Sequence, residues 1–118
     1  MMIRTNDLPY VIEVEIDGEV TEEDIKDFEA YFKQKKENLI NKDKLNLLME
    51  IRSLNYTIDG LIKDIKFDTS HLDDFDKVAM VSDKKWAEIG EKLVKYMPQV
   101  EVRQFDPEEK EQAKVWVS

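Results

Sequence analysis

Few side chains in this sequence could carry out nucleophilic chemistry. Ser53 and Thr57 lie close together along the chain, and His71 is its only histidine. A hydroxyl becomes a nucleophile when a base takes its proton and a third group orients that base. No such set occurs here at a recognisable spacing, so we expect the hydroxyls to cap a following helix and His71 to lie on the surface. The sequence therefore predicts a protein that is not an enzyme.

A second candidate chemistry is binding of a divalent cation by clustered carboxylates. Four aspartates lie close together in the chain, at Asp68, Asp73, Asp74 and Asp76. Their spacing differs from that of the calcium-binding EF-hand loop, and the central glycine of that loop is missing. A run of like charges usually marks a solvated segment. We therefore expect an exposed acidic loop, with no bound metal and no cofactor.

Lys84 and Lys85 stand at the start of a predicted helix, where the helix dipole disfavours cations. A bound anion would suit both lysines and the free N–H groups of the first turn, although plain exposed lysines also fit. The next residue, Trp86, and Trp116 near the end of the chain are both expected to fill the core. The alternative role of Trp86 is to line a pocket with Tyr56 and Phe67, beyond the carboxyl ends of the strands.

The overall composition excludes several classes of function. The chain has 118 residues, no cysteine and a net charge of −9, from 27 acidic and 18 basic side chains. That length predicts one domain, and the absence of cysteine excludes disulfides, thiol nucleophiles and zinc–thiolate sites. The negative charge disfavours nucleic acid as a partner. No signal peptide or membrane-spanning segment is evident, so we expect a cytoplasmic protein without stable membrane insertion.

Hydropathy patterns predict the strands that would position these residues. Strands are expected at residues 10–16, 45–51, 77–82 and 100–105, with a short partner strand at 2–4. The first alternates apolar and acidic residues, which predicts one buried face. The segments at 45–51 and 77–82 are almost continuously apolar and should be central, whereas 100–105 should lie near an edge. Residues 52–57 are expected to form an irregular polar loop.

A helix is predicted after each of the four longer strands. The first begins at Thr21, with Asp24 completing a capping box, and buries Ile25, Phe28 and Phe32. The second begins near Thr57 or Asp59, the third near residue 82 or 83, and the last at residues 106–107. Alternating strands and helices predict an α/β fold, a single mixed and mostly parallel sheet of four to five strands with helices packed on it.

Three segments, in this order, carry a resemblance to a known family. They are Glu15–Asp24, Val78–Trp86, and Phe105-Asp106-Pro107 followed by Ala113 and Trp116. Over nearly its whole length the chain resembles the SpoIIAA-like family, a branch of the STAS-like folds. The resemblance implies a fold like that of anti-sigma-factor antagonists and of lipid-exchange domains of the SEC14 type.

The resemblance also bears on regulation by phosphorylation. In regulatory STAS proteins a serine at the start of the second helix is phosphorylated, within an Asp-Ser-Ser-Gly-like stretch. Here the corresponding stretch is Tyr56–Gly60, where Gly60 matches the glycine but no serine precedes it. Thr57 is the nearest hydroxyl, followed by Ile58 and Asp59. The phosphorylation switch is therefore not carried over to this chain.

These observations lead to two expected functions. The first is a non-enzymatic STAS-like regulatory or protein-interaction module, which binds a basic partner or itself through the second helix and residues 52–60. The alternative is a carrier or sensor that holds a lipid or other small apolar ligand between sheet and helices, near Trp86 and Ile62. The candidate partner- or ligand-binding residues are Ser53, Tyr56, Thr57, Asp59, Gly60, Lys84, Lys85 and Trp86.

Overall fold

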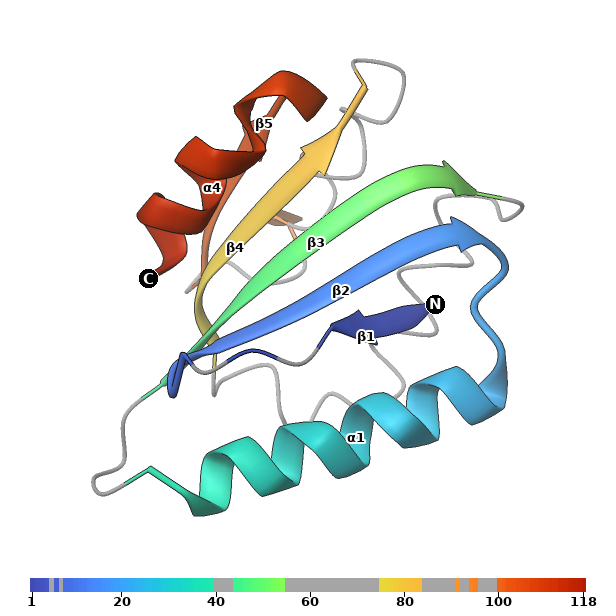
Figure 1. The fold of residues 1–118 in the computed structure, drawn as a ribbon, viewed down its shortest axis with the longest axis vertical. Coiled ribbons are helices and arrows are strands. Elements are labelled where there is room, and N and C mark those ends of the chain that lie inside the picture. Colours follow the sequence, from blue (N-terminus) through green and yellow to red (C-terminus); the bar gives the residue numbers. More distant parts are fainter. Residues whose placement is uncertain are drawn as a thin grey trace.

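The apolar segments of the chain form a five-stranded sheet in a computed structural model (Figure 1). The structure describes residues 1–4, 6, 8–39, 44–54, 75–83, 91, 94–95 and 100–118. In chain order the elements are β1 (Met2–Arg4), β2 (Val11–Gly18), α1 (Glu22–Glu37), β3 (Leu45–Leu54), β4 (Phe75–Ser82), β5 (Glu101–Phe105), a short 3-10 turn (Pro107–Glu109) and α4 (Lys110–Val117).

The order of strands across the sheet follows the order along the chain, from β1 to β5. β1 runs antiparallel to β2, and the other three pairings are parallel. The predicted mixed, mostly parallel α/β sheet is therefore confirmed. The two most apolar strands, β3 and β4, are interior as predicted, and β5 lies at an edge.

The two described helices lie on opposite sides of the sheet (Figure 1). On the α1 side, Phe32 packs into a large apolar cluster, and its ring centroid lies 5.3 Å from that of Phe75. On the α4 side, Ala113 and Val117 are fully buried against a smaller cluster from β2 to β5. Trp116 is only partly buried there, and it is Val117 that points fully into the interior.

The start of α1 has the capping box that the sequence predicts. The Thr21 hydroxyl accepts a hydrogen bond from the Asp24 backbone N–H at 3.1 Å, and Asp24 Oδ2 accepts one from the Thr21 N–H at 2.9 Å. These bonds satisfy donors that a helix start leaves free. Of the predicted apolar stripe, Phe32 is buried, and Ile25 and Phe28 pack partly buried against the same cluster. This helix therefore begins and packs as predicted.

Three predictions about strand ends and faces are wrong. Residues 52–54 were expected in a loop, and Asp17 and Gly18 were expected to end β2. Instead β2 and β3 stay paired as far as Gly18 and Leu54, across an irregularity between Ile16 and Asp17. Gly18 has a φ of 93°, a left-handed conformation that glycine adopts without steric cost. β2 also does not leave its acidic face exposed, because Glu15 is buried.

The predicted second helix lies outside the described residues. Of the predicted third helix, the described residues Glu91, Val94 and Lys95 have helical backbone. In the described ranges, no helix combines the length and the apolar character that crossing a membrane requires.

Candidate functional site

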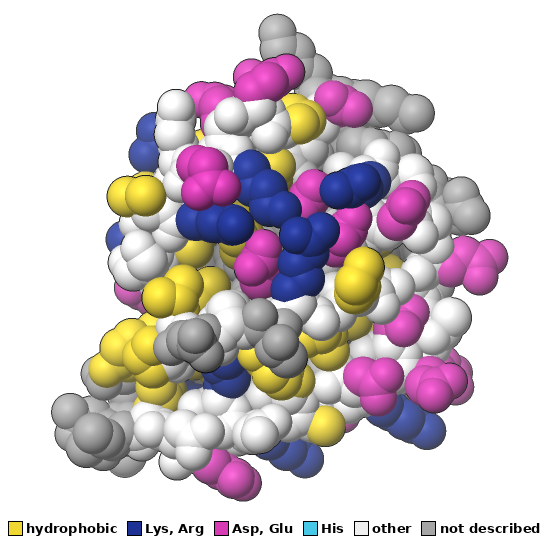
Figure 2. Space-filling model, viewed as in Figure 1, with side chains coloured by type: hydrophobic (Ala, Val, Ile, Leu, Met, Phe, Trp, Pro, Cys, Tyr) yellow, Lys and Arg dark blue, Asp and Glu magenta, His cyan; other side chains and the backbone are white. Residues whose placement is uncertain are grey.

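Two glutamates lie side by side on the sheet face that α4 covers. Glu15 of β2 and Glu50 of β3 are direct neighbours in the strand register, and their side chains are 8% and 15% exposed. Buried carboxylates require partners, because removing a charge from water is costly. Figure 2 shows Lys and Arg side chains gathered near the middle of the view, with Asp and Glu between them.

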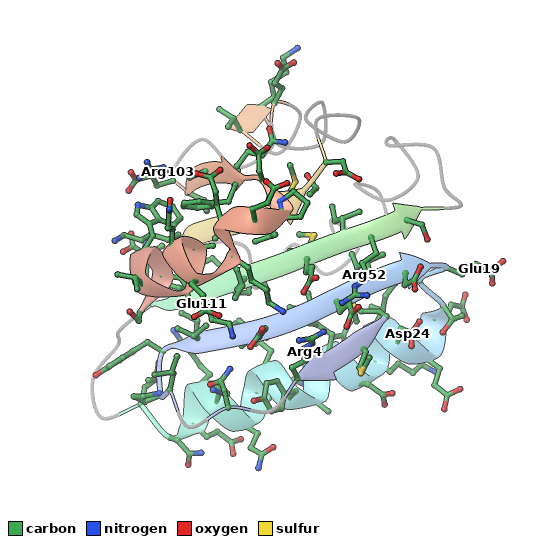
Figure 3. All side chains as sticks on the ribbon, turned by 45° about the horizontal axis from the view of Figure 1, so that its top comes forward. Arg4, Glu19, Asp24, Arg52, Arg103 and Glu111 are labelled. Atoms are coloured by element: carbon green, nitrogen blue, oxygen red, sulfur yellow. The ribbon has the colours of Figure 1, made fainter. Side chains whose placement is uncertain are left out.

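Three cations from three elements surround these carboxylates. Arg4 of β1 forms an ion pair with Glu15, and its guanidinium lies 3.8 Å from Glu50 Oε2. Arg52 Nε lies 2.5 Å from Glu15 Oε1 and 3.4 Å from Glu50 Oε1. Lys110 Nζ of α4 lies 2.8 Å from Glu50 Oε2. We call these five residues the glutamate network; Figure 3 shows Arg4 and Arg52 close together in it.

The cations favour the ionised form of Glu50. Burial acts to raise the pKa of Glu50. The nearby cations, first Lys110 and then Arg4 and Arg52, lower that pKa below its ordinary value. The hydrogen bond to Glu15 raises the pKa of Arg4. Lys110 is close to Glu50 Oε2 but is not aligned for a hydrogen bond, and in the described residues this oxygen accepts none. The network therefore joins β1, β2, β3 and α4 by charge, and Glu50 does not serve as a proton donor at neutral pH.

A second group of carboxylates is exposed where β2 ends and α1 begins. The side chains are those of Asp17, Glu19, Glu22, Glu23 and Asp27, which we call the acidic edge. Within the described ranges none of them forms an ion pair. Figure 3 places Glu19 at the end of β2 and Asp24 at the start of α1. The acidic edge therefore presents negative charge to solvent without local neutralisation.

Asp24 lies within this region but is already paired. Its Oδ2 lies 3.1 Å from the amino group of Met1. The backbone hydrogen bond from Thr21 is the main cause that lowers the pKa of Asp24. Asp24 therefore fixes the helix start and is not counted in the acidic edge.

A hollow of about 310 Å³ adjoins the acidic edge. Its described lining residues are Met1, Met2, Ile3, Asp24 and Asp27. Met2 is 57% exposed, and Asp27 belongs to both the hollow and the acidic edge. Methionine side chains are flexible and polarizable, so they adapt to differently shaped apolar groups. The hollow therefore offers an apolar contact beside a negatively charged surface.

Cations and aromatic rings meet on the α4 side at the opposite edge of the sheet. Lys77 Nζ lies 5.2 Å from the centroid of the Trp116 ring, and Arg103 Cζ lies 6.0 Å from it. Arg103 also lies 5.2 Å from the Phe105 ring centroid. Trp116 was expected to be core and instead forms one side of this half-buried group. Arg103 lies across the view from Glu19 in Figure 3.

A SpoIIAA-like family model matches residues 11–118. This chain belongs to the SpoIIAA-like family. A search of the curated proteins finds no match. Among solved structures, the chain is similar to an uncharacterized DUF3478-family protein from Shewanella loihica PV-4 with a SpoIIAA-like fold. The TM-score is 0.70 at 17% identity, and the match covers 99% of this chain and 91% of that one. At this identity the similarity establishes the fold alone.

Of the candidate residues predicted for this SpoIIAA-like chain, the structure describes Ser53. Its hydroxyl donates a hydrogen bond of 2.6 Å to Asp17 Oδ1, which joins the carboxyl ends of β2 and β3 next to the acidic edge. The other predicted candidates, Tyr56, Thr57, Asp59, Gly60, Lys84, Lys85 and Trp86, lie outside the described residues.

The predicted acidic loop is described only at Asp76, which is exposed on β4. His71, Asp68, Asp73 and Asp74 lie outside the described residues. Across the parts of the chain that the structure describes, no three His, Asp or Glu side chains are placed to hold a metal ion.

The glutamate network was missed by reasoning from the sequence. The available signal was Glu50, an acidic residue inside a strand that was expected to be covered on both faces. Such a residue is almost never buried without a cation or hydrogen-bond donors. The sequence could predict that Glu50 needs partners, but not that they come from β1, β3 and α4.

Proposed function

We propose that this SpoIIAA-like chain is a non-enzymatic interaction module that binds a basic protein partner on its acidic edge. The observation that carries the proposal is the group of five exposed carboxylates without ion pairs in the described structure. Clustered like charges produce a negative potential that attracts and orients a positively charged partner. The net charge of −9 adds to this attraction at long range.

The contrast with the glutamate network supports this proposal. Glu15 and Glu50 are enclosed and neutralised by three cations, so their charges stabilise the fold. The acidic edge has no comparable set of cations in the described structure. Glu22 and Glu23 favour the start of α1 through the helix dipole. The exposed charges of Asp17, Glu19 and Asp27 add little to stability, and a role in recognition accounts for them.

The hollow next to the acidic edge supports a protein partner rather than a small cation. A docked segment could place an apolar side chain against Met1, Met2 and Ile3 while its lysines or arginines contact Glu23 and Asp27. Binding energy at protein interfaces is usually concentrated in a few such buried anchors. The polar surroundings then provide specificity and a fast association rate.

The acidic edge lies beside the start of the docking segment predicted from the sequence. Ser53 lies at the end of β3, where the predicted docking segment 52–60 begins, and its hydroxyl binds Asp17 of the acidic edge. The rest of that segment lies outside the described residues, so its participation stays a prediction. Cytoplasmic location and the absence of nucleic acid binding likewise rest on charge and composition.

The non-enzymatic part of the proposal rests on the chemistry of the described polar groups. The lowered pKa of Glu50 makes it a poor proton donor or acceptor near pH 7. Ser53 donates its hydrogen to a carboxylate, a much weaker base than the imidazole that usually activates a serine. These groups are suited to holding structure and surface charge in place.

The test is site-specific photo-crosslinking in the native cell, with a photoreactive residue at Glu23 and, as the matched position, at Glu37 farther along α1. Both side chains are exposed. We expect position 23 to capture a protein with a basic surface and position 37 not to capture it. The captured partner is then purified, and its affinity is measured at low and high salt. Binding should weaken strongly with salt, because exposed charges are screened.

Two double variants with equal charge change decide whether the acidic edge is responsible. Glu19→Lys with Asp27→Lys should weaken binding of the purified partner by at least roughly tenfold, since an opposite charge replaces each carboxylate at the contact. Glu37→Lys with Glu111→Lys alters exposed residues elsewhere and should change binding by less than about threefold. Equal losses in both variants, or no loss in the first, would contradict the proposal.

The carrier alternative rests on Trp86 and Ile62, which lie outside the described residues. In the described structure the apolar groups on the two faces of the sheet pack into two clusters. The hollow at Met1–Ile3 includes two aspartates in its lining, which suits a basic segment better than a lipid chain.

A further inference from the structure

The outer edge of β5 is a surface that the proposed function does not use. β5 is the last strand of the sheet, so one row of its backbone N–H and C=O groups faces away from β4. Such a row is a template for pairing with another strand. On β5, the side chains of Glu101, Arg103 and Gln104 are exposed, and Val102 is partly buried.

In the described structure neither Glu101 nor Arg103 forms an ion pair. Arg103 contacts the rings of Phe105 and Trp116 instead of a carboxylate. Lys77, which is the β4 neighbour of Glu101 in the register, likewise lies over the Trp116 ring. Two charges of opposite sign therefore stand two residues apart on one face of an outer strand.

The other outer strand, β1, is less suited to pairing. It has only three residues, and Arg4 is held in the glutamate network. β5 has five residues, and in the described structure neither Glu101 nor Arg103 forms an ion pair. Proteins commonly protect an outer strand with charges of one sign, which repel any approaching copy. A strand with Glu101 and Arg103 repels a copy in most registers but attracts it in one.

We propose that β5 pairs antiparallel with β5 of a second copy of this chain, about a two-fold axis through Val102. In this register Glu101 faces Arg103 of the second copy, and Arg103 faces Glu101 of the second copy. Side chains directly opposite each other in an antiparallel pair have their Cβ atoms about 4.5–5.5 Å apart, close enough for ion pairing. The contact is isologous, so it closes as a dimer and joins the two sheets into one.

Other registers place like charges together. An antiparallel pairing centred on Glu101 or on Arg103 puts that residue opposite itself in the second copy. A parallel in-register pairing puts each charge beside its own copy. A slip by one residue moves the side chains of the second copy to the other face of the sheet, because successive side chains alternate between faces. Glu101 of one copy and Arg103 of the other then lie on opposite faces and cannot pair. The Val102-centred register alone pairs both charges.

The expected dimer is weak. In this register only residues 101–103 of β5 in each copy face each other, so the interface is smaller than the roughly 800 Å² per partner of a standard stable complex. Both copies also carry a net charge of −9, which opposes association. We therefore expect a dimer that forms with rising concentration and dissociates on dilution.

The experiment is sedimentation equilibrium of the full chain from roughly 10 μM to 1 mM, a range that covers weak dimers. The wild type should shift from monomer toward dimer. Glu101→Arg and Arg103→Glu, made singly, should each weaken dimerisation by roughly tenfold, because two opposite-charge pairs become like-charge pairs. The double variant Glu101→Arg with Arg103→Glu should restore the wild-type constant, because the pairs are then exchanged.

Net charge cannot produce this pattern. Glu101→Arg makes the chain less negative and Arg103→Glu makes it more negative, yet both should weaken the dimer. Glu37→Arg and Lys33→Glu, at exposed positions of α1, apply the same charge changes away from β5 and should leave the constant within about threefold of wild type. Thermal unfolding confirms that each variant is folded. A wild type that stays monomeric at about 1 mM, or a double variant as weak as the single variants, would overturn the proposal.

Discussion

The two faces of the sheet are held to their neighbours by different forces. Under α1, Phe32 belongs to an apolar cluster of buried residues from β2, β3 and β4, and its ring centroid lies 5.3 Å from that of Phe75. On the opposite face, α4 covers an apolar cluster with Ala113 and Val117, while the part nearer β1 is occupied by the glutamate network. One face therefore depends on buried area, and the other depends partly on charge.

This difference indicates which parts of the fold should be sensitive to pH and salt. Apolar burial changes little with pH or salt at constant temperature. A network of ionised groups near the surface weakens when salt screens it or when its carboxylates are protonated. Arg52 is 57% exposed, so the network is open to solvent at one end. We expect α1 to stay packed under conditions in which the contacts of α4 and β1 loosen.

The largest effect is expected from Phe32→Ala on the apolar face. Phe32 is 2% exposed, and its truncation removes a ring and leaves a cavity. Such changes cost about 3–5 kcal/mol of the free energy of unfolding. The loss should be the same at low and high salt and at pH 7 and pH 5. Urea unfolding followed by circular dichroism measures it.

Val115→Ala is the matched control for this substitution. Val115 is an apolar residue on α4 that is 76% exposed, so its truncation should change the free energy of unfolding by less than about 0.5 kcal/mol. If Phe32→Ala cost no more than the control, or if its cost depended on salt, the comparison between the two faces would fail.

A smaller effect, with a pH signature, is expected from Glu50→Gln. Glu50→Gln leaves Lys110, Arg4 and Arg52 without this carboxylate partner, which should cost about 1–3 kcal/mol of the free energy of unfolding at pH 7. The pKa of Glu50 in the folded protein lies below its ordinary value of 4.5, so the native state favours the ionised form. This contribution is present above the ordinary pKa and is lost as pH falls through the lowered one. The gap between wild type and Glu50→Gln should therefore narrow from pH 7 to pH 3.

Urea unfolding at a series of pH values measures this gap directly. The lowered pKa of Asp24 also makes stability fall in acid, but it acts in both proteins and cancels in the difference. High salt at pH 7 should narrow the gap as well. A gap that stays constant across pH and salt would show that the network acts through packing and not through charge.

Much of the sheet could be predicted from local patterns. β3 and β4 are almost continuously apolar, and only an interior strand buries both faces in that way. Thr21 and Asp24 predict the start of α1 because capping depends on residues three apart. The end of β3 could not be predicted in this way. Arg52 is the extra residue at the irregularity, and it and Ser53 stay extended because β2 pairs with Ile51 before them and with Ser53 and Leu54 after it. Glu15 and Asp17 also bind the side chains of Arg52 and Ser53.

The functional surfaces were less predictable for the same reason. Glu15 alternates with apolar neighbours, a pattern that predicts a solvent-facing side chain. In the structure its side chain is instead buried and forms ion pairs with Arg4 and Arg52. Lys110 reaches Glu50 only because α4 returns to the sheet after β5, which is a long-range feature of the fold. Ser53 was singled out from its position in the chain, and the structure adds its partner Asp17.

The smallest effect is expected from breaking an exposed ion pair, which can be compared directly with the glutamate network. Glu111→Ala removes the ion pair between Glu111 and Lys114, whose charged atoms lie 3.8 Å apart, in a side chain that is 86% exposed. Exposed pairs of this kind contribute about 0–1 kcal/mol, so we expect a change below about 0.5 kcal/mol with no dependence on pH between 5 and 8. Urea unfolding of this variant and of Glu50→Gln, measured side by side, gives the change.

Both substitutions remove one negative charge in contact with a lysine of α4, so a larger cost for Glu50 reflects its enclosure by β1, β3 and α4. If the two costs were equal, enclosure would add nothing, and the charged face would be held by the packing of α4 alone.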